Sequence, residues 1–191
     1  MFAELKKPFS DIKMRPKSNA KGLTSDTSKS KFYSICEIRP YLFIAGCMDV
    51  SHKKIRELRI THIVDAANIS ETQRTPNVQY LEVNINDDER EDIKKHFIEA
   101  AAFIKKAKES GGKALVYCAA GISRSASICI IYLAIEENMT IKDAYIEIEK
   151  VRPIICPNLG FWRQMINYEI EKRGETSVNL LNGMRRPIFY D

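Results

Sequence analysis

Residues 114–125 read Ala-Leu-Val-Tyr-Cys-Ala-Ala-Gly-Ile-Ser-Arg-Ser, and this stretch decides the fold class. Its first four residues form a short apolar run of the kind that becomes a buried strand. A loop of small residues follows, and from Ser125 the pattern is that of a buried helix that continues through Glu137. A buried strand that passes through a short loop into a helix is typical of a sheet covered by helices.

The rest of the chain continues the alternation of strands and helices. Short apolar or alternating runs predict four more strands, and apolar positions at helical spacing predict four more helices. The strands are expected at 33–38, 42–45, 60–66 and 80–85, and the helices at 50–58, 92–108, 141–151 and 159–172. We therefore expect one α/β domain with a central mixed, mostly parallel sheet flanked by helices.

The positive charge of the chain is concentrated at its N-terminus. Residues 1–31 hold eight Lys/Arg and three acids, and this excess of five equals the net charge of +5 for all 191 residues. Their Ser- and Lys-rich composition predicts a disordered basic tail, because it offers little apolar surface to bury. Residues 32–191 carry 22 basic and 22 acidic groups, so this neutral body argues against a nucleic-acid partner.

The location of the protein is predicted from what the sequence does not contain. No stretch reaches the roughly 18 apolar residues that a membrane span needs, so no integral membrane segment is expected. Lys6 and Lys7 are followed by Pro8 instead of the apolar run of a signal peptide. Five cysteines are too few for a disulfide scaffold in a chain of this length. We expect free thiols and a cytoplasmic location, with the nucleus left open as a second compartment.

The loop after the predicted strand at 114–117 has the composition of an anion-binding site. A loop that enters a helix N-terminus directs several backbone N–H groups at one point, where the helix dipole adds positive potential. Gly121 permits a tight turn, and Arg124 can donate two hydrogen bonds to an oxyanion. The same field favours the thiolate of Cys118, and Ser125 can donate to its sulfur. The predicted phosphate-binding residues are Ala119, Ala120, Gly121, Ile122, Ser123 and Arg124.

The stretch Cys-Ala-Ala-Gly-Ile-Ser-Arg-Ser, which begins at Cys118, resembles the Cys-x5-Arg-Ser signature of cysteine-based protein phosphatases. Arg152-Pro153 and the residues Pro-Asn-Leu-Gly-Phe-Trp-Arg-Gln at 157–164 are most similar to the small, atypical dual-specificity group. The resemblance implies a protein-tyrosine-phosphatase-like fold and a catalytic domain at 32–174, which leaves 175–191 as a C-terminal tail. It also implies that Cys118 is the nucleophile, that Arg124 binds phosphate and that Ser125 assists the second step.

A phosphoryl transfer of this kind needs an acid that gives a proton to the leaving oxygen. The acidic cluster at 87–92 follows a predicted strand, where such groups gather in α/β proteins. Alignment with the family on Ile93 and Phe97 implies that Asp87 is the acid, with Asp88 as the second candidate. Asp92 is expected to cap the following helix.

One residue departs from the family pattern. Tyr117 stands where the family has a histidine before the nucleophile, and a tyrosine carries no positive charge at neutral pH. The sequence therefore predicts reduced activity, and a weakly active or inactive phosphoprotein-binding pseudophosphatase is the alternative. An RNA 5′-phosphatase is a second rival that the neutral body disfavours.

The expected function is hydrolysis of phosphotyrosine, phosphoserine and phosphothreonine in proteins through a phosphocysteine intermediate. The expected partners are phosphorylated proteins, with signalling kinases as one class to consider. Neither a cofactor nor a metal is expected, since His52, His62 and His96 have no second ligand at metal spacing. The oligomeric state cannot be predicted from these residues.

Overall fold

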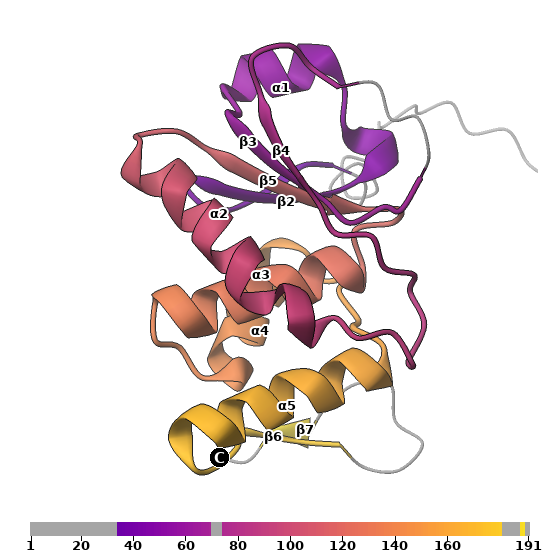
Figure 1. The fold of residues 1–191 in the computed structure, drawn as a ribbon, viewed down its shortest axis with the longest axis vertical. Helices are drawn as coiled ribbons and strands as arrows, with labels where there is room; N and C mark the ends of the chain where they lie inside the picture. Colours follow the sequence, from indigo (N-terminus) through magenta and orange to yellow (C-terminus); the bar gives the residue numbers. More distant parts are fainter. Residues whose placement is uncertain (1–33, 70–73, 181–187, 190–191) are drawn as a thin grey trace, which may run out of the picture.

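The computed structural model describes residues 34–69, 74–180 and 188–189, so the predicted basic tail at 1–31 lies outside the described residues. Its centre is a five-stranded sheet with the strand order β1-β2-β5-β3-β4 (Figure 1). Only the β1–β2 pair is antiparallel, so the sheet is mixed and mostly parallel as expected. The strands are β1 (Cys36–Arg39), β2 (Leu42–Gly46), β3 (His62–Asp65), β4 (Gln79–Glu82) and β5 (Ala114–Cys118).

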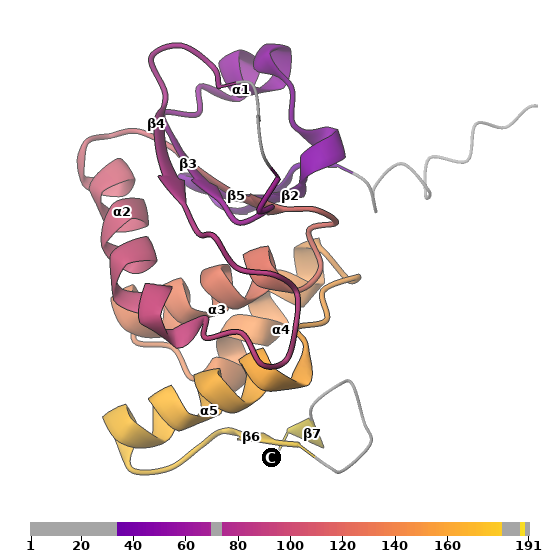
Figure 2. The same ribbon diagram turned by 45° about the vertical axis from the view of Figure 1, so that its right-hand side comes forward.

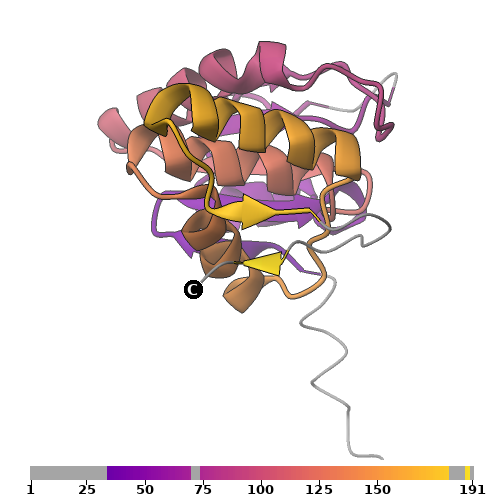
Figure 3. The same ribbon diagram turned by 90° about the horizontal axis from the view of Figure 1, so that it is seen from below.

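Helices cover both faces of this sheet. One face packs against α1, and α2, α3 and α4 lie on the other face with α5 outside α3 (Figures 1 and 2). Seen from below, α5 runs alongside α3, with the short strands β6 and β7 beside it (Figure 3). The helices are α1 (His52–Leu58), α2 (Phe97–Glu109), α3 (Arg124–Glu136), α4 (Ile141–Val151) and α5 (Leu159–Arg173). Two 3₁₀ turns, η2 (Cys47–Asp49) and η3 (Lys94–His96), and the strands β6 (Val178–Asn179) and β7 (Ile188–Phe189) complete the described elements.

The helix α3 occupies the centre of the core. Its residues from Arg124 to Leu133 are all buried, because α2, α4, α5 and the sheet surround it. A helix that is apolar on every side is stable only in such a position. As a result its N-terminus is fixed at the edge of the sheet where the parallel strands end.

The carboxyl ends of three parallel strands meet at that edge. In register, Gly46 of β2 pairs with Cys118 of β5, and Asp65 of β3 pairs with Tyr117. The loops that leave these strands therefore converge on the N-terminus of α3. This is the edge at which open α/β sheets bind their ligands.

The predicted elements are all present, most of them with shifted ends, while α4 has the predicted ends. The largest shift is at the helix expected from residue 92, where the α-helix begins only at Phe97 after the 3₁₀ turn η3. The Asp92 carboxylate accepts from the backbone N–H of Lys95 at 3.3 Å, but the N-cap residue of α2 is His96, so the expectation that Asp92 caps the helix is wrong. Among the described residues, no helix is both long and apolar enough to cross a membrane.

The segment after α5 folds back onto the domain. Val178 is buried in the core, and the buried Glu169 carboxylate accepts from the backbone N–H groups of Ile141 and Ser177, each at 2.8 Å. One carboxylate thus joins the start of α4 to the residues that follow α5. The first part of the C-terminal tail is therefore held by packing and by hydrogen bonds.

Candidate active site

The loop between β5 and α3, residues 119–123, curls around the sulfur of Cys118 and is called the Cys118 loop below. The backbone N–H of Gly121 donates to Cys118 Sγ at 3.2 Å, and Ser125 Oγ lies 3.3 Å from the same sulfur. Gly121 has a φ of +69°, and a Cβ there would lie 2.5 Å from Arg152 Nη2. Only glycine fits this turn, since both its torsion angle and the space around it exclude a side chain.

The environment of Cys118 favours its thiolate. Burial acts to raise the pKa of the thiol, but hydrogen bonds from the Ser125 side chain and from backbone N–H groups outweigh it and hold the pKa below its ordinary value. The neighbouring Cys47 shows the opposite balance, because burial and the negative charge of Cys118 raise its pKa. The thiolate, which is the nucleophilic form, is therefore favoured at one particular cysteine.

We expect alkylation of Cys118 by iodoacetamide to reach half its maximal rate at a lower pH than alkylation of Cys47. Only the thiolate reacts, so a lowered pKa moves the midpoint to lower pH and a raised pKa moves it to higher pH. Timed alkylation over a pH series, followed by peptide mass spectrometry, measures both sites in one sample. Equal midpoints for the two cysteines would contradict this account of the loop.

Arg124 lies beside the Cys118 loop with part of its guanidinium still free. Its Nη1 donates to the carbonyl oxygens of Ala67 at 2.8 Å and Ile85 at 3.3 Å, which lie in the segments that follow β3 and β4. The side chain is buried, yet its Nε has no hydrogen-bond partner among the described residues. A buried N–H group without a partner is costly, and a bound oxyanion would satisfy it.

The two candidate acids occupy different positions. The Asp87 carboxylate accepts from Ser123 Oγ at 2.6 Å and from Asn158 Nδ2 at 2.8 Å, so it is joined to the Cys118 loop. Asp88 instead binds the side chain and the backbone N–H of Arg90, which lowers its pKa to about 2. Asp88 is therefore engaged with Arg90 and not with the Cys118 loop. This geometry favours Asp87 as the acid.

The loop that carries Asp87 is held by close packing against α5. A Cβ on Gly160 would overlap the backbone carbonyl of Glu89, so only glycine allows this approach. Gln164 adds a hydrogen bond from its Nε2 to the carbonyl oxygen of Glu91 at 2.8 Å. The first turns of α5 therefore set the position of the acidic loop relative to the Cys118 loop.

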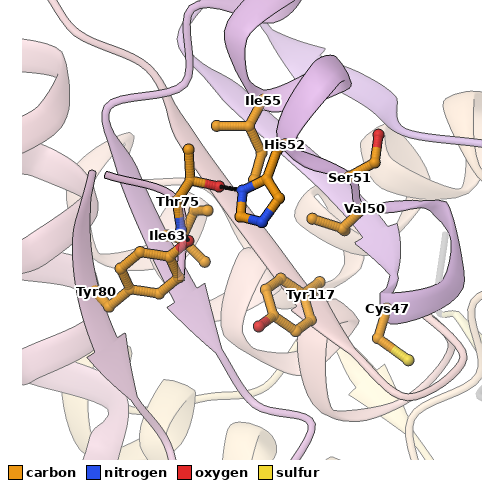
Figure 4. Close-up of a pocket in the computed structure, with 9 residues that line it drawn as sticks. All are labelled: Cys47, Val50, Ser51, His52, Ile55, Ile63, Thr75, Tyr80 and Tyr117. Atoms are coloured by element: carbon orange, nitrogen blue, oxygen red, sulfur yellow. Dashed lines mark hydrogen bonds between the residues drawn. The ribbon is translucent and has the colours of Figure 1, made fainter. Parts of the chain in front are cut away.

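Tyr117 faces away from the Cys118 sulfur, because successive side chains of a strand point to opposite faces of the sheet. Its ring lines a cavity of about 280 Å³ under α1, together with Cys47, His52 and Tyr80 (Figure 4). Its hydroxyl donates to Asp65 Oδ2 at 2.5 Å. Tyr117, the residue that departs from the family pattern, thus lies on the face of the sheet opposite the Cys118 sulfur and outside the Cys118 loop.

Arg152 is a functional residue that the sequence pattern alone does not reveal. It is 1% exposed, and its Nε and Nη2 donate to the carbonyl oxygens of Gly121 at 2.7 Å and Ala120 at 3.1 Å. Nη1 donates to the carbonyl oxygen of Ser34 at 2.9 Å. By holding these loop carbonyls outward, Arg152 leaves the loop N–H groups directed inward. In the sequence, only the Arg-Pro pair in the stretch that resembles the family signals it.

We expect Arg152→Met to lower the free energy of unfolding by roughly 2–4 kcal/mol, because it leaves buried carbonyls without donors. Urea unfolding followed by circular dichroism measures this change. Arg163→Met is the matched control, because the Arg163 side chain is 64% exposed and forms only a surface ion pair, with 3.9 Å between its Nη1 and Glu89 Oε2. The control should change stability by less than about 0.5 kcal/mol. Equal effects of the two variants would show that the contacts of Arg152 are not structural.

Comparison with known proteins gives the following relationships. The family model "Dual specificity phosphatase, catalytic domain" matches residues 42–171. Dual specificity protein phosphatase 14 of Mus musculus is 34% identical over 155 residues, which cover 81% of this chain and 78% of that protein. Dual specificity protein phosphatase 5 of Rattus norvegicus is 35% identical over 136 residues, which cover 71% of this chain and 35% of that protein. The crystal structure of human DUSP28 matches with a TM-score of 0.70 at 28% identity, covering 73% of this chain and 95% of that one.

Proposed function

Because the chain belongs to the dual specificity phosphatase family, we propose that it hydrolyses phosphotyrosine, phosphoserine and phosphothreonine in proteins through a phosphocysteine intermediate. One observation carries this proposal. The Cys118 sulfur accepts a backbone N–H at 3.2 Å, and beside the same loop Arg124 Nε has no hydrogen-bond partner within the part of the chain that the structure describes. A nucleophile and an unsatisfied cationic donor at one point suit a phosphate group.

In the first step, the oxygens of the substrate phosphate bind the loop N–H groups and the Arg124 guanidinium. The Cys118 thiolate attacks phosphorus, so that a sulfur–phosphorus bond forms as the bond to the side-chain oxygen breaks. Asp87, in its protonated form, gives its proton to the departing oxygen. The products are the dephosphorylated protein and a phosphocysteine.

In the second step, water attacks the phosphorus and Asp87, now ionised, takes its proton. The sulfur–phosphorus bond breaks and inorganic phosphate leaves. Ser125 Oγ, 3.3 Å from the sulfur, donates a hydrogen bond to the thiolate that re-forms. This bond favours the second step because it stabilises the charge that develops on the leaving sulfur.

The substrate class follows from the charge of the loop. Residues 119–123 carry no Lys or Arg, so the loop offers no cation for the additional phosphates of a phosphoinositide. Outside residues 1–31 the basic and acidic groups are equal in number, which disfavours an RNA 5′-end. Phosphorylated proteins, signalling kinases among them, are the proposed partners, and the cytoplasm and nucleus are the proposed compartments.

Phosphate release from matched phosphotyrosine, phosphothreonine and phosphoserine peptides tests this proposal. A phosphoinositide and a 5′-triphosphorylated RNA are assayed beside them. Turnover of the peptides is expected on both residue classes. Inertness toward every peptide, with turnover of the lipid or the RNA, would overturn the substrate assignment.

A phosphoprotein-binding pseudophosphatase is the second candidate, and Tyr117 is the observation that favours it. If this were the function, wild-type protein and Asp87→Ala would retain phosphopeptides equally and neither would turn them over. The Asp87–Ser123 contact and the lowered pKa of Cys118 support the enzyme instead.

We expect Tyr117→His to raise kcat/KM and to move the acidic limb of the pH–rate profile to lower pH. A protonated imidazole beside Asp65 adds positive charge near Cys118, and this charge favours the thiolate. Steady-state kinetics with an aryl phosphate across the pH range measures both changes. An unchanged profile together with unchanged turnover would show that residue 117 does not limit activity.

A further inference from the structure

We propose that Tyr117 and Asp65 form a hydrogen-bonded relay that positions Arg124 from the opposite face of the sheet. The inference rests on the proposed function for the identity of the group that Arg124 binds. It makes Tyr117 a positioning residue in its own right, whereas the sequence pattern presents it only as a missing histidine. The relay consists of Tyr117, Asp65, Ala67 and Arg124.

The first half of the relay lies behind the sheet. The Tyr117 hydroxyl donates to Asp65 Oδ2 at 2.5 Å, and the backbone N–H of Ala67 donates to Asp65 Oδ1 at 2.9 Å. Tyr117 is 5% exposed and Asp65 is 7% exposed, so water has little access to these bonds. A buried carboxylate is stable only when its oxygens are hydrogen-bonded, and here each oxygen has a donor.

The second half reaches the candidate active site. Ala67 is held at its N–H by Asp65, and its carbonyl oxygen accepts from Arg124 Nη1 at 2.8 Å. The second acceptor of Nη1, the carbonyl oxygen of Ile85, lies further away at 3.3 Å. A guanidinium is planar, so fixing Nη1 also fixes the direction in which Nε points, and Nε has no hydrogen-bond partner in residues 34–69 and 74–180. The backbone turn at 65–67 therefore sets the orientation of the Arg124 guanidinium.

The surroundings of Tyr117 allow its hydroxyl to be tested apart from its ring. The ring borders the cavity under α1 (Figure 4). It lies on the face of the sheet opposite the Cys118 side chain, because successive side chains of a strand alternate between the faces. Phenylalanine keeps the ring and its packing, and removes the hydroxyl that donates to Asp65 Oδ2. That carboxylate oxygen then loses this donor, and the turn that holds the Ala67 carbonyl loosens. Arg124 loses its orientation while its charge stays in place.

The same cavity supplies a control. Tyr80 also lines it, and its hydroxyl accepts from the backbone N–H of Thr75 at 2.9 Å. Tyr80→Phe therefore removes a hydroxyl from the same cavity without breaking the relay.

The test is the affinity for inorganic tungstate, a tetrahedral oxyanion, measured by protection of Cys118 from alkylation. We expect Tyr117→Phe to raise the Kd about tenfold, as the loss of a buried charged hydrogen bond predicts. The pH midpoint of Cys118 alkylation without tungstate should stay unchanged, since the relay acts on Arg124 and not on the thiol. Tyr80→Phe should retain the wild-type Kd.

A double-mutant cycle with Asp65→Ala examines the link between the two residues. If they act through one relay, the double variant Asp65→Ala with Tyr117→Phe binds tungstate with the same Kd as Asp65→Ala alone. Should Asp65→Ala fail to fold, Tyr117→Phe and its control decide the matter without it. An unchanged Kd in Tyr117→Phe, additive losses in the cycle, or an equal loss in Tyr80→Phe would overturn the inference.

Tungstate binding requires no turnover, so the inference and the proposed function can fail separately. A wild-type protein that binds tungstate through the relay but hydrolyses no phosphoester would retain the inference and lose the proposed reaction. Turnover in wild type together with an unchanged tungstate Kd in Tyr117→Phe would retain the proposed reaction and overturn the inference.

Discussion

Replacing Cys118 by serine should lower the turnover of an aryl phosphate by about 10⁴- to 10⁶-fold, as removal of a nucleophile does in other enzymes that form covalent intermediates. The serine hydroxyl stays protonated at neutral pH, so the hydrogen bonds that favour a thiolate have no anion to stabilise. The loop N–H groups and Arg124 remain, and phosphopeptide binding should persist. Release of phosphate measures the first effect, and retention on a phosphopeptide resin measures the second.

Cys47→Ser is the matched control for this substitution. Cys47 Sγ donates to the carbonyl oxygen of Ala119 at 3.3 Å, so it touches the same loop without belonging to it. A serine hydroxyl can keep that bond, and the control should turn over close to the wild-type rate. If both variants lost turnover equally, the assignment of Cys118 as the nucleophile would fail.

Asp87→Asn should lower kcat by about 10²- to 10⁴-fold for substrates whose leaving oxygen is strongly basic. The amide cannot supply a proton, and a serine or threonine alkoxide leaves poorly without one. A phenolate with a low pKa needs less help, so the loss should shrink as the leaving group becomes more acidic. A series of substituted aryl phosphates compared with a phosphoserine peptide measures this dependence.

Asp88→Asn separates the two candidate acids. Asp88 Oδ1 accepts a hydrogen bond from Arg90 Nε at 3.0 Å. The substitution weakens this contact, which lies outside the Cys118 loop. We expect a small change in kcat that does not vary with the leaving group. A loss for Asp88→Asn that tracks leaving-group basicity, with Asp87→Asn near wild type, would transfer the role to Asp88.

The sequence predicts best what is contiguous in the chain. The strand–loop–helix at 114–137 could be predicted because apolar periodicity, small loop residues and the helix start all lie within one stretch. The family resemblance that this stretch carries is confirmed, as is the mostly parallel sheet. Cys118 and Ser125 share this stretch, so their proximity follows from local geometry.

Contacts between distant segments could not be predicted in the same way. Arg152 donates to Gly121, which lies 31 residues earlier, and no periodicity links the two positions. The choice between Asp87 and Asp88 depends on which carboxylate meets Ser123 and Asn158 and which meets Arg90. Adjacent acids in one loop look alike until tertiary contacts give each of them a partner.

The most direct test of the account is a rapid acid quench of wild-type protein during turnover of an aryl phosphate, followed by peptide mass spectrometry. We predict one phosphoryl group on the peptide that contains Cys118. The adduct should accumulate more in Ser125→Ala, because the leaving sulfur has then lost its hydrogen bond. Phosphate release that proceeds with no phosphorylated Cys118 at any quench time in either protein, or with the phosphoryl group on another residue, would contradict the account.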